Sequence, residues 1–219
     1  MTKSDIQLKQ DIEAELAWEP QVNAAHIGVT VEKGAVSLLG TVDSYAEKWA
    51  AQDAIKRVAG VRTVAQDLTV KVRSEHERSD SDIAVAVQAA LTWDVVVPPT
   101  VTATVRQGTV TLEGMAAWNY QREAAERAVR YLKGVAAVRN DVRLVAQVSA
   151  AQVKEKVQAA LQRQASLDGH SIHIEASGGK VTLSGHASSW QSIEDAAHAA
   201  WAVPGVVEVV DLVKHAMTV

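Results

Sequence analysis

Few residues in this 219-residue chain could carry out chemistry, and their spacing argues against catalysis. The chain contains no cysteine, which excludes disulfides, thiolate metal sites and a cysteine nucleophile. It has no G-x-S-x-G motif, and no spacing pairs a serine with a base. It also lacks the G-x-G-x-x-G, Walker A and G-x-x-G patterns that hold dinucleotides, phosphates or RNA. We therefore expect a protein that is not an enzyme.

Seven histidines raise the question of a metal site. His170 and His173 are three residues apart in a predicted strand, which places their side chains on opposite faces. His186, His198 and His215 fall in different predicted elements, with no H-E-x-x-H motif or acidic cluster beside them. The sequence therefore predicts no metal and no cofactor.

Charge and hydropathy limit the partners that the chain can have. The net charge of −4 and the pI of about 6.0 exclude a chain-wide basic surface, so nucleic acid is not expected. Charged residues interrupt every candidate apolar run, which predicts no transmembrane segment. Residues 1–16 contain acids and no apolar stretch of the kind found in secretory signals. These features predict a cytoplasmic protein, or a periplasmic one if a natural N-terminus has been removed.

One predicted helix carries a basic stripe that could face an anionic phospholipid surface. The candidate lipid-binding residues are Arg122, Arg127, Arg130, Lys133 and the preceding Trp118. Four basic residues would supply about 4 kcal/mol, or a dissociation constant of about 1 mM, so attachment requires several copies or an inserted tryptophan. The alternative interpretation is an ordinary solvated face with the i, i+4 pairs Glu123–Arg127 and Glu126–Arg130.

The elements that must position these residues follow from an internal repeat. Glycines spaced by 6 and then 20 residues occur three times, as Gly34, Gly40, Gly60; Gly108, Gly114, Gly134; and Gly179, Gly185, Gly205. The first glycine of each set is predicted to shape a turn, the second to end a strand where the backbone bends, and the third to follow a helix. The predicted repeats span residues 1–73, 78–146 and 149–219.

Each repeat shows the hydrophobic pattern of an α-β-β-α-β unit, with two helices on a three-stranded mixed sheet. This order predicts an α+β fold. The first helix carries an i, i+4, i+8 stripe, which is Leu8-Ile12-Leu16, Ile83-Val87-Leu91 and Val153-Val157-Leu161 in the three copies. The second helix has an alanine-rich stripe, which is Ala51-Ala54-Ile55-Val58, Ala125-Ala128-Val129-Leu132 and Ala196-Ala199-Ala200-Val203.

Local signals at the ends of these elements add detail. Ser44 with Glu47, and Ser188 with Gln191, have the capping-box spacing, and Asn119 is the weaker candidate cap in the middle copy. The linker at residues 72–80 is polar and is predicted to be flexible. The linker at residues 146–150 is shorter and is expected to hold the second and third repeats more rigidly.

Six tryptophans in a chain without phenylalanine are unusual. Trp18 and Trp93 occupy equivalent positions at the end of the first helix, where we expect core or capping contacts. The remaining four differ between copies, which favours packing between repeats over contact with lipid; they are Trp49, Trp118, Trp190 and Trp201.

The hairpin V-x-L-x-G, followed by an amphipathic helix and G-V-x-x-V, resembles the BON domain family. The pattern occurs three times, as Val36-Leu38-Gly40 with Gly60-Val61-Val64, Val110-Leu112-Gly114 with Gly134-Val135-Val138, and Val181-Leu183-Gly185 with Gly205-Val206-Val209. The resemblance implies a non-enzymatic module attached to phospholipid membranes in envelope or osmotic-stress proteins. Two alternatives stay open: a cytoplasmic stress protein that binds potassium or another small ligand, and a protein–protein interaction scaffold, either of which could form a homo-oligomer.

Overall fold

The order of elements in the structure confirms the predicted α+β fold of three tandem α-β-β-α-β repeats. The computed structural model describes residues 3–145, 150–162, 172–177, 179–187 and 190–215. Repeat 1 contains α1 (Asp5–Trp18), η1 (Ala24–His26), β1 (Ile27–Glu32), β2 (Ala35–Val42), α2 (Tyr45–Lys56) and β3 (Thr63–Val70). Repeat 2 contains α3 (Asp80–Trp93), β4 (Thr102–Arg106), β5 (Thr109–Glu113), β6 (Met115–Ala116), α4 (Asn119–Arg130), β7 (Ala137–Asn140) and β8 (Arg143–Leu144). Repeat 3 contains α5 (Ala150–Gln162), β9 (Ile172–Ser177), β10 (Lys180–Ala187), α6 (Trp190–Trp201) and β11 (Glu208–His215).

Each repeat is built on a mixed three-stranded sheet. In repeat 1, β2 lies in the middle, antiparallel to β1 and parallel to β3. The orders β4-β5-β7 and β9-β10-β11 reproduce this topology, and in repeat 2 the short strands β6 and β8 form a further two-stranded parallel sheet. The hairpin must be antiparallel because its turn is short, whereas the second helix provides the crossover that the parallel pair needs.

Three separate hydrophobic cores lie between the helices and the sheets. In repeat 1 the stripe Leu8, Ile12 and Leu16 is buried against Val36 and Leu38 of the central strand. Alanines of the second helix are fully buried in each repeat, so that this helix approaches the sheet closely. The predicted side chain of Leu161 lies outside the described residues.

The repeated glycines adopt the conformations that explain their spacing, with one correction. The turn glycines and the glycines after the second helix have positive φ, as in Gly34 (80°) and Gly60 (106°). The prediction that the middle glycine ends its strand is wrong for repeats 1 and 3, because β2 and β10 run on through Gly40 and Gly185. The strand continues because its parallel partner also continues, and the glycine supplies a bend within it.

An aspartate in the first turn of the first helix holds the hairpin turn in repeats 1 and 2. The Asp5 carboxylate accepts hydrogen bonds from the backbone N–H groups of Lys33 and Gly34, at 2.7 and 3.2 Å. Asp80 does the same for Gln107 and Gly108, and these bonds hold the pKa of Asp80 below its ordinary value. The two bonds stabilise a turn in which a non-glycine residue has φ near 50°.

The helix caps agree with the sequence in repeat 1 but not in repeat 2. Ser44 caps α2 by accepting a hydrogen bond from the N–H of Glu47 at 3.1 Å, while the Glu47 carboxylate accepts from Asp43 N at 2.7 Å. The sequence predicts Asn119 as the cap of α4, and this prediction is wrong, because Asn119 is the first residue of the helix. Trp118 occupies the N-cap position, and the Gln121 side chain accepts a hydrogen bond from the backbone N–H of Trp118 at 3.1 Å. The glutamine side chain therefore satisfies this end of the helix without a short polar residue at the N-cap position. Ser188 lies outside the described residues.

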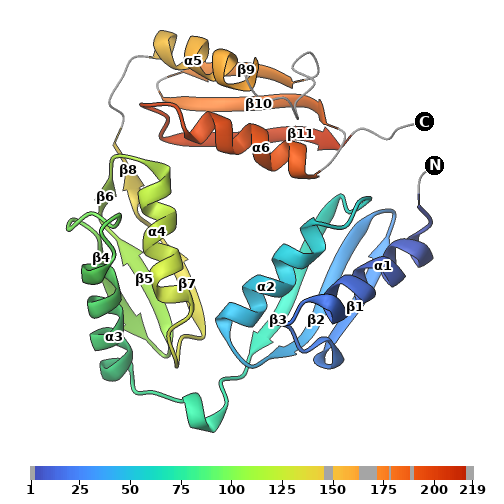
Figure 1. Cartoon of the computed structure of the whole chain (residues 1–219), viewed down its shortest axis with the longest axis vertical. Coiled ribbons are helices and arrows are strands. Elements are labelled where there is room, and N and C mark those ends of the chain that lie inside the picture. Colours follow the sequence, from blue (N-terminus) through green and yellow to red (C-terminus); the bar gives the residue numbers. More distant parts are fainter. Residues whose placement is uncertain (1–2, 146–149, 163–171, 178, 188–189, 216–219) are drawn as a thin grey trace.

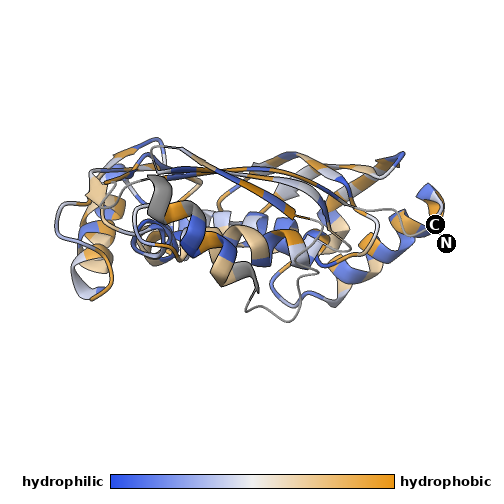
Figure 2. Cartoon of the chain, turned by 90° about the horizontal axis from the view of Figure 1, so that it is seen from above, coloured by the Kyte–Doolittle hydropathy of each residue, from blue (hydrophilic) through white to orange (hydrophobic). Residues whose placement is uncertain are grey.

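The three repeats form a triangle in which α2, α4 and α6 lie toward the middle and α1, α3 and α5 toward the outside (Figure 1). The strands lie along one side of the molecule and the helices along the other (Figure 2). The linker after repeat 1 contains the short helix η2 (Ser74–His76), and Arg73 within it binds Asp43. Most of the linker after repeat 2, residues 146–149, lies outside the described residues.

We predict that Gly114→Ala destabilises the protein strongly, by about 3 kcal/mol or more. Gly114 has φ of 121°, and a Cβ there would overlap the backbone carbonyl oxygen of Thr100. Gly28→Ala is the matched control, since a Cβ there would lie 3.6 Å from the Leu39 carbonyl oxygen. Urea unfolding followed by circular dichroism measures both. A Gly114→Ala midpoint as high as that of Gly28→Ala would contradict the assigned backbone conformation.

Candidate functional site

Arg130, one of the five predicted lipid-binding residues, lies at the junction between repeats 1 and 2. Its guanidinium carbon is 3.8 Å from the centroid of the Trp49 ring, and its Nη2 is 3.2 Å from a carboxylate oxygen of Glu126. The side chain is only 10% exposed. Stacking on an aromatic face and pairing with a carboxylate are both favourable for a planar guanidinium. The predicted pair Glu126–Arg130 is therefore confirmed, and Arg130 joins the two repeats.

Arg122 occupies a similar place between repeats 2 and 3. Its guanidinium carbon lies 5.0 Å from the centroid of the Trp201 ring on α6. Partial burial lowers the pKa of Arg122, while Glu123 and Glu126 oppose this shift by favouring the charged form. The predicted packing of copy-specific tryptophans between repeats is thus confirmed at Trp49 and Trp201.

The other three predicted residues have different surroundings. Arg127 and Lys133 are exposed. Trp118 is half-buried at the start of α4, with its ring centroid 6.2 Å from that of Tyr120. Two of the four basic side chains of the stripe are therefore placed against tryptophans of neighbouring repeats, and two face solvent.

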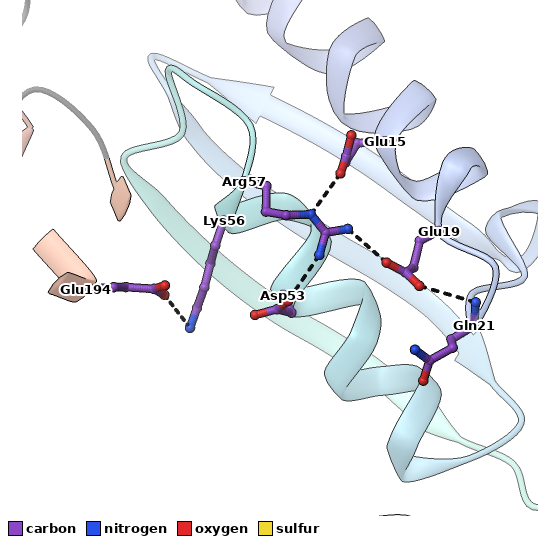
Figure 3. Close-up of polar contacts among 7 residues, drawn as sticks. All are labelled: Glu15, Glu19, Gln21, Asp53, Lys56, Arg57 and Glu194. Atoms are coloured by element: carbon purple, nitrogen blue, oxygen red, sulfur yellow. Dashed lines mark hydrogen bonds and ion pairs between the residues drawn. The ribbon is translucent and has the colours of Figure 1, made fainter. Parts of the chain in front are cut away.

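Repeats 1 and 3 also meet, although they are distant in sequence. The Lys56 ammonium lies 3.1 Å from a carboxylate oxygen of Glu194 on α6 (Figure 3). The Trp190 indole N–H donates to the carbonyl oxygen of Val61, and its ring packs on the hydrophobic core of repeat 1. Trp190 is the third tryptophan for which packing between repeats is confirmed.

The end of α2 that faces repeat 3 is fixed by an ion-pair network around Arg57 (Figure 3). The Arg57 guanidinium contacts Glu15 at 2.9 Å, Glu19 at 2.8 Å and Asp53 at 3.1 Å. The hydrogen bonds to Glu15 and Glu19 raise the pKa of Arg57, which stays charged. The network ties α1 to the end of α2 and so positions Lys56.

Tyr45 completes the junction between repeats 1 and 2. It begins α2 and packs against the hydrophobic core of repeat 2. Burial raises the pKa of its hydroxyl, the negative charge of Glu126 raises it further, and the positive charge of Arg130 lowers it. A side chain of repeat 1 therefore contributes directly to the apolar packing of repeat 2.

A hollow of about 240 Å³ lies beside this junction. Its polar lining includes Asp43, His76, Arg130 and Lys133. Asp43 is bound by Arg73 at 2.5 Å and Arg130 by Glu126. Lys133 adds a further positive charge to the lining, and the buried Nε of Arg130 has no hydrogen-bond partner among the described residues.

Trp18 and Trp93 are exposed, which corrects the expectation of core or capping contacts. They are 83% and 87% exposed and are the last residues of α1 and α3. Each follows the last buried leucine of its helix, Leu16 or Leu91, by two residues. Two residues correspond to about 200° of helical rotation, which points the ring away from the core. This angle was available from the sequence.

The described part of the chain contains no group of three histidine, cysteine or acidic residues that could hold a metal ion. His170 lies outside the described residues. Among the described helices, none is long and apolar enough to span a bilayer.

Comparison with known proteins identifies one family. The model of the BON domain matches residues 4–72, 79–146 and 149–217. No curated protein sequence matches the chain. Two solved structures that are similar come from CdsD, a structural protein of the type III secretion system of Chlamydia trachomatis, one of them of its C-terminal domain. They show 14% and 15% identity, cover 98% and 95% of this chain and 100% and 92% of their own, and have TM-scores of 0.28. At these TM-scores the likeness supports no inference about function.

We predict that Arg130 and Trp49 are energetically coupled across the junction. In a double-mutant cycle of Trp49→Ala and Arg130→Ala, we expect a coupling free energy of about 1 to 2 kcal/mol, because the contact is largely shielded from water. Trp49→Ala combined with Arg127→Ala is the control, since Arg127 is an exposed residue of the same helix. Urea unfolding of each variant gives the free energies. Additive effects of Trp49 and Arg130 would show that the two side chains do not interact in solution.

Proposed function

The chain belongs to the BON domain family, and from that membership we propose that it is a non-catalytic protein that attaches to phospholipid membrane surfaces in osmotic or envelope stress. The family is linked in general to membrane association and to stress proteins, which supports this proposal at the level of class. The residues that would make the contact are a proposal from the geometry of this chain.

The observation that carries the proposal is the exposure of Trp18 and Trp93. Tryptophan is favoured at the boundary between lipid headgroups and acyl chains, because its ring is apolar and its N–H can still bond to water. Both rings occupy the same position, the end of the first helix, in two repeats. Val95, which is 98% exposed, follows Trp93 closely and adds apolar surface there.

Basic side chains contribute less to the proposed membrane binding than the four residues of the basic stripe predict from the sequence. Of its four cations, Arg122 and Arg130 stack on tryptophans of neighbouring repeats, whereas Arg127 and Lys133 are exposed. Two cations near an anionic leaflet supply about 2 kcal/mol, which is too little for attachment alone. Insertion of the exposed tryptophans is therefore the main contribution that we propose.

We predict that replacing both exposed tryptophans weakens vesicle binding. Trp18→Ala with Trp93→Ala should lower the binding constant for phosphatidylglycerol vesicles by at least about tenfold, or about 1.4 kcal/mol. The measurement is co-sedimentation with vesicles of phosphatidylglycerol and of phosphatidylcholine, each at low and raised salt. The control is Leu39→Ala with Leu212→Ala, two exposed apolar residues on strands, which should leave binding unchanged.

Further arms of the same assay separate the alternatives. Arg127→Glu with Lys133→Glu should reduce binding to the anionic vesicles and not to the neutral ones. The proposal would be contradicted if the unchanged protein bound neither kind of vesicle. It would also be contradicted if replacing Trp18 and Trp93 left vesicle binding unchanged. A thermal melt that shifts in potassium but not in sodium would instead favour the ion-binding alternative.

A further inference from the structure

The hollow beside the junction of repeats 1 and 2 is lined by three segments of the chain. The start of α2 contributes Ser44 and Ala46, the linker after repeat 1 contributes Val72 and His76, and the end of α4 contributes residues 130–135. The volume of about 240 Å³ is below the roughly 300 Å³ at which pockets for drug-sized ligands begin. A ligand in this hollow would be small, and it would contact both repeats and the linker between them.

Arg130 is the least exposed of the basic side chains that line the hollow. Its side chain is 10% exposed, against 40% for that of His76, and Lys133 is exposed. The Nε–H group of Arg130 is buried and donates to no acceptor in the part of the chain that the structure describes. A buried donor without an acceptor is costly, and more so when it belongs to a charged group. Arg130 therefore lacks an acceptor, and it lines a space that is large enough to hold one.

The charged side chains around the hollow leave an excess of positive charge. Asp43 is bound by Arg73, and Arg130 by Glu126, so that each of these pairs is neutral. Lys133 lines the hollow and forms no ion pair with the residues that the structure describes. Its ammonium group is therefore available to a ligand of opposite charge.

The backbone on one side of the hollow also favours negative charge. Ser44 is the N-cap of α2 and Ala46 is its second residue, and the N–H groups in the first turn of a helix attract anions. The end of α4 has the opposite partial charge, of about half a unit, which the full charge of Lys133 outweighs. The carboxylate of Glu75 lies 3.9 Å from His76, but this side chain is largely exposed and is not part of the lining. The hollow as a whole thus favours an anion.

We propose that the hollow binds a phosphate group, and that the bound phosphate stabilises the junction between repeats 1 and 2. The donors lie on different sides of the hollow, with Arg130 and Lys133 at the end of α4 and the free N–H groups at the start of α2. A tetrahedral phosphate has acceptor oxygens in several directions and can bond to all of them, whereas the oxygens of a carboxylate lie in one plane. The site is separate from the membrane contact proposed above, because neither Trp18 nor Trp93 lines the hollow.

Isothermal titration calorimetry in a buffer without phosphate tests the site, with inorganic phosphate and glycerol phosphate as probes. The unchanged protein should bind each probe at a single site. Lys133→Gln should weaken binding at least about tenfold, the loss expected for one hydrogen bond to a charged group. Arg127→Gln is the matched control and should leave the affinity unchanged, since Arg127 is an exposed cation of the same helix that does not line the hollow.

A second variant tests the lining from the side of repeat 1. Ala46→Glu places a carboxylate in the first turn of α2, where an acidic residue suits the start of a helix and should leave the fold intact. It should abolish binding of both probes, whereas Ala46→Gln, which has the same size without the charge, should bind more tightly than Ala46→Glu.

The effect on the junction is measured by urea unfolding. Because the phosphate contacts both repeats, it should raise the urea midpoint of the unchanged protein more than that of Lys133→Gln. This comparison cancels the general stabilisation that phosphate gives through its exclusion from protein surfaces, since that part is the same in both proteins.

The same phosphate group could be free or belong to a lipid, and vesicles separate these two sources. Vesicles that contain phosphatidic acid are added to the protein with Trp18→Ala and Trp93→Ala, so that the membrane contact proposed above is removed. Vesicle binding that inorganic phosphate displaces at constant ionic strength, and that Ala46→Glu abolishes, would assign the hollow to a lipid phosphate. Binding of the free probes alone would assign it to a soluble phosphate compound.

Two results would overturn the proposal. The first is the absence of binding of either free probe up to about 10 mM, where a site with a millimolar Kd is nearly saturated, together with no vesicle binding that depends on Ala46. The second is equal affinity of the probes for Lys133→Gln, Ala46→Glu and the unchanged protein, which would place the phosphate elsewhere on the surface.

Discussion

The structure depends on side chains at the ends of three short helices, because each repeat alone has only a small core. A unit of about 70 residues buries a limited fraction of its surface and is marginally stable. Here Tyr45 adds to the core of repeat 2 and Trp190 to the core of repeat 1. Contacts between repeats thus supply apolar burial that a single repeat lacks, and they turn three α+β units into one closed assembly.

This arrangement also determines which surfaces are left for a partner. Arginines that would be suited to an anionic membrane, Arg122 and Arg130, are instead placed against tryptophans of neighbouring repeats. The exposed tryptophans Trp18 and Trp93 are the last residues of α1 and α3. These two helices lie toward the outside of the triangle (Figure 1), and the contacts between repeats described above do not involve either tryptophan. The contacts between repeats therefore use the second helix of each repeat, whereas the proposed membrane contact uses the first helix of repeats 1 and 2.

Much of the fold could be predicted from the sequence, because its signals are local and occur three times. The spacing of glycines, the stripe Leu8-Ile12-Leu16 and the Ser44 cap each depend on neighbours in the chain. The surroundings of Arg122 and Arg130 could not be predicted, since they depend on how separate repeats are placed. The exposure of Trp18 is different, because the helical angle from Leu16 indicates it. The equivalent position of Trp93 in repeat 2 favours a core contact, and that prediction is wrong.

Contacts between all three pairs of repeats close the chain into a ring of repeats, and this closed arrangement holds repeats 1 and 3 at a fixed distance. Pulsed electron spin resonance measures that distance directly, with nitroxide labels on Thr30→Cys and Glu175→Cys, which replace exposed residues of β1 and β9. If the three repeats are closed in this way, the distribution of distances between the two labels is single and narrow in dilute protein. It becomes clearly broader when Trp190→Ala removes the contact of the Trp190 side chain with repeat 1. A broad distribution in the otherwise unchanged chain would show that the three repeats are independent domains on linkers.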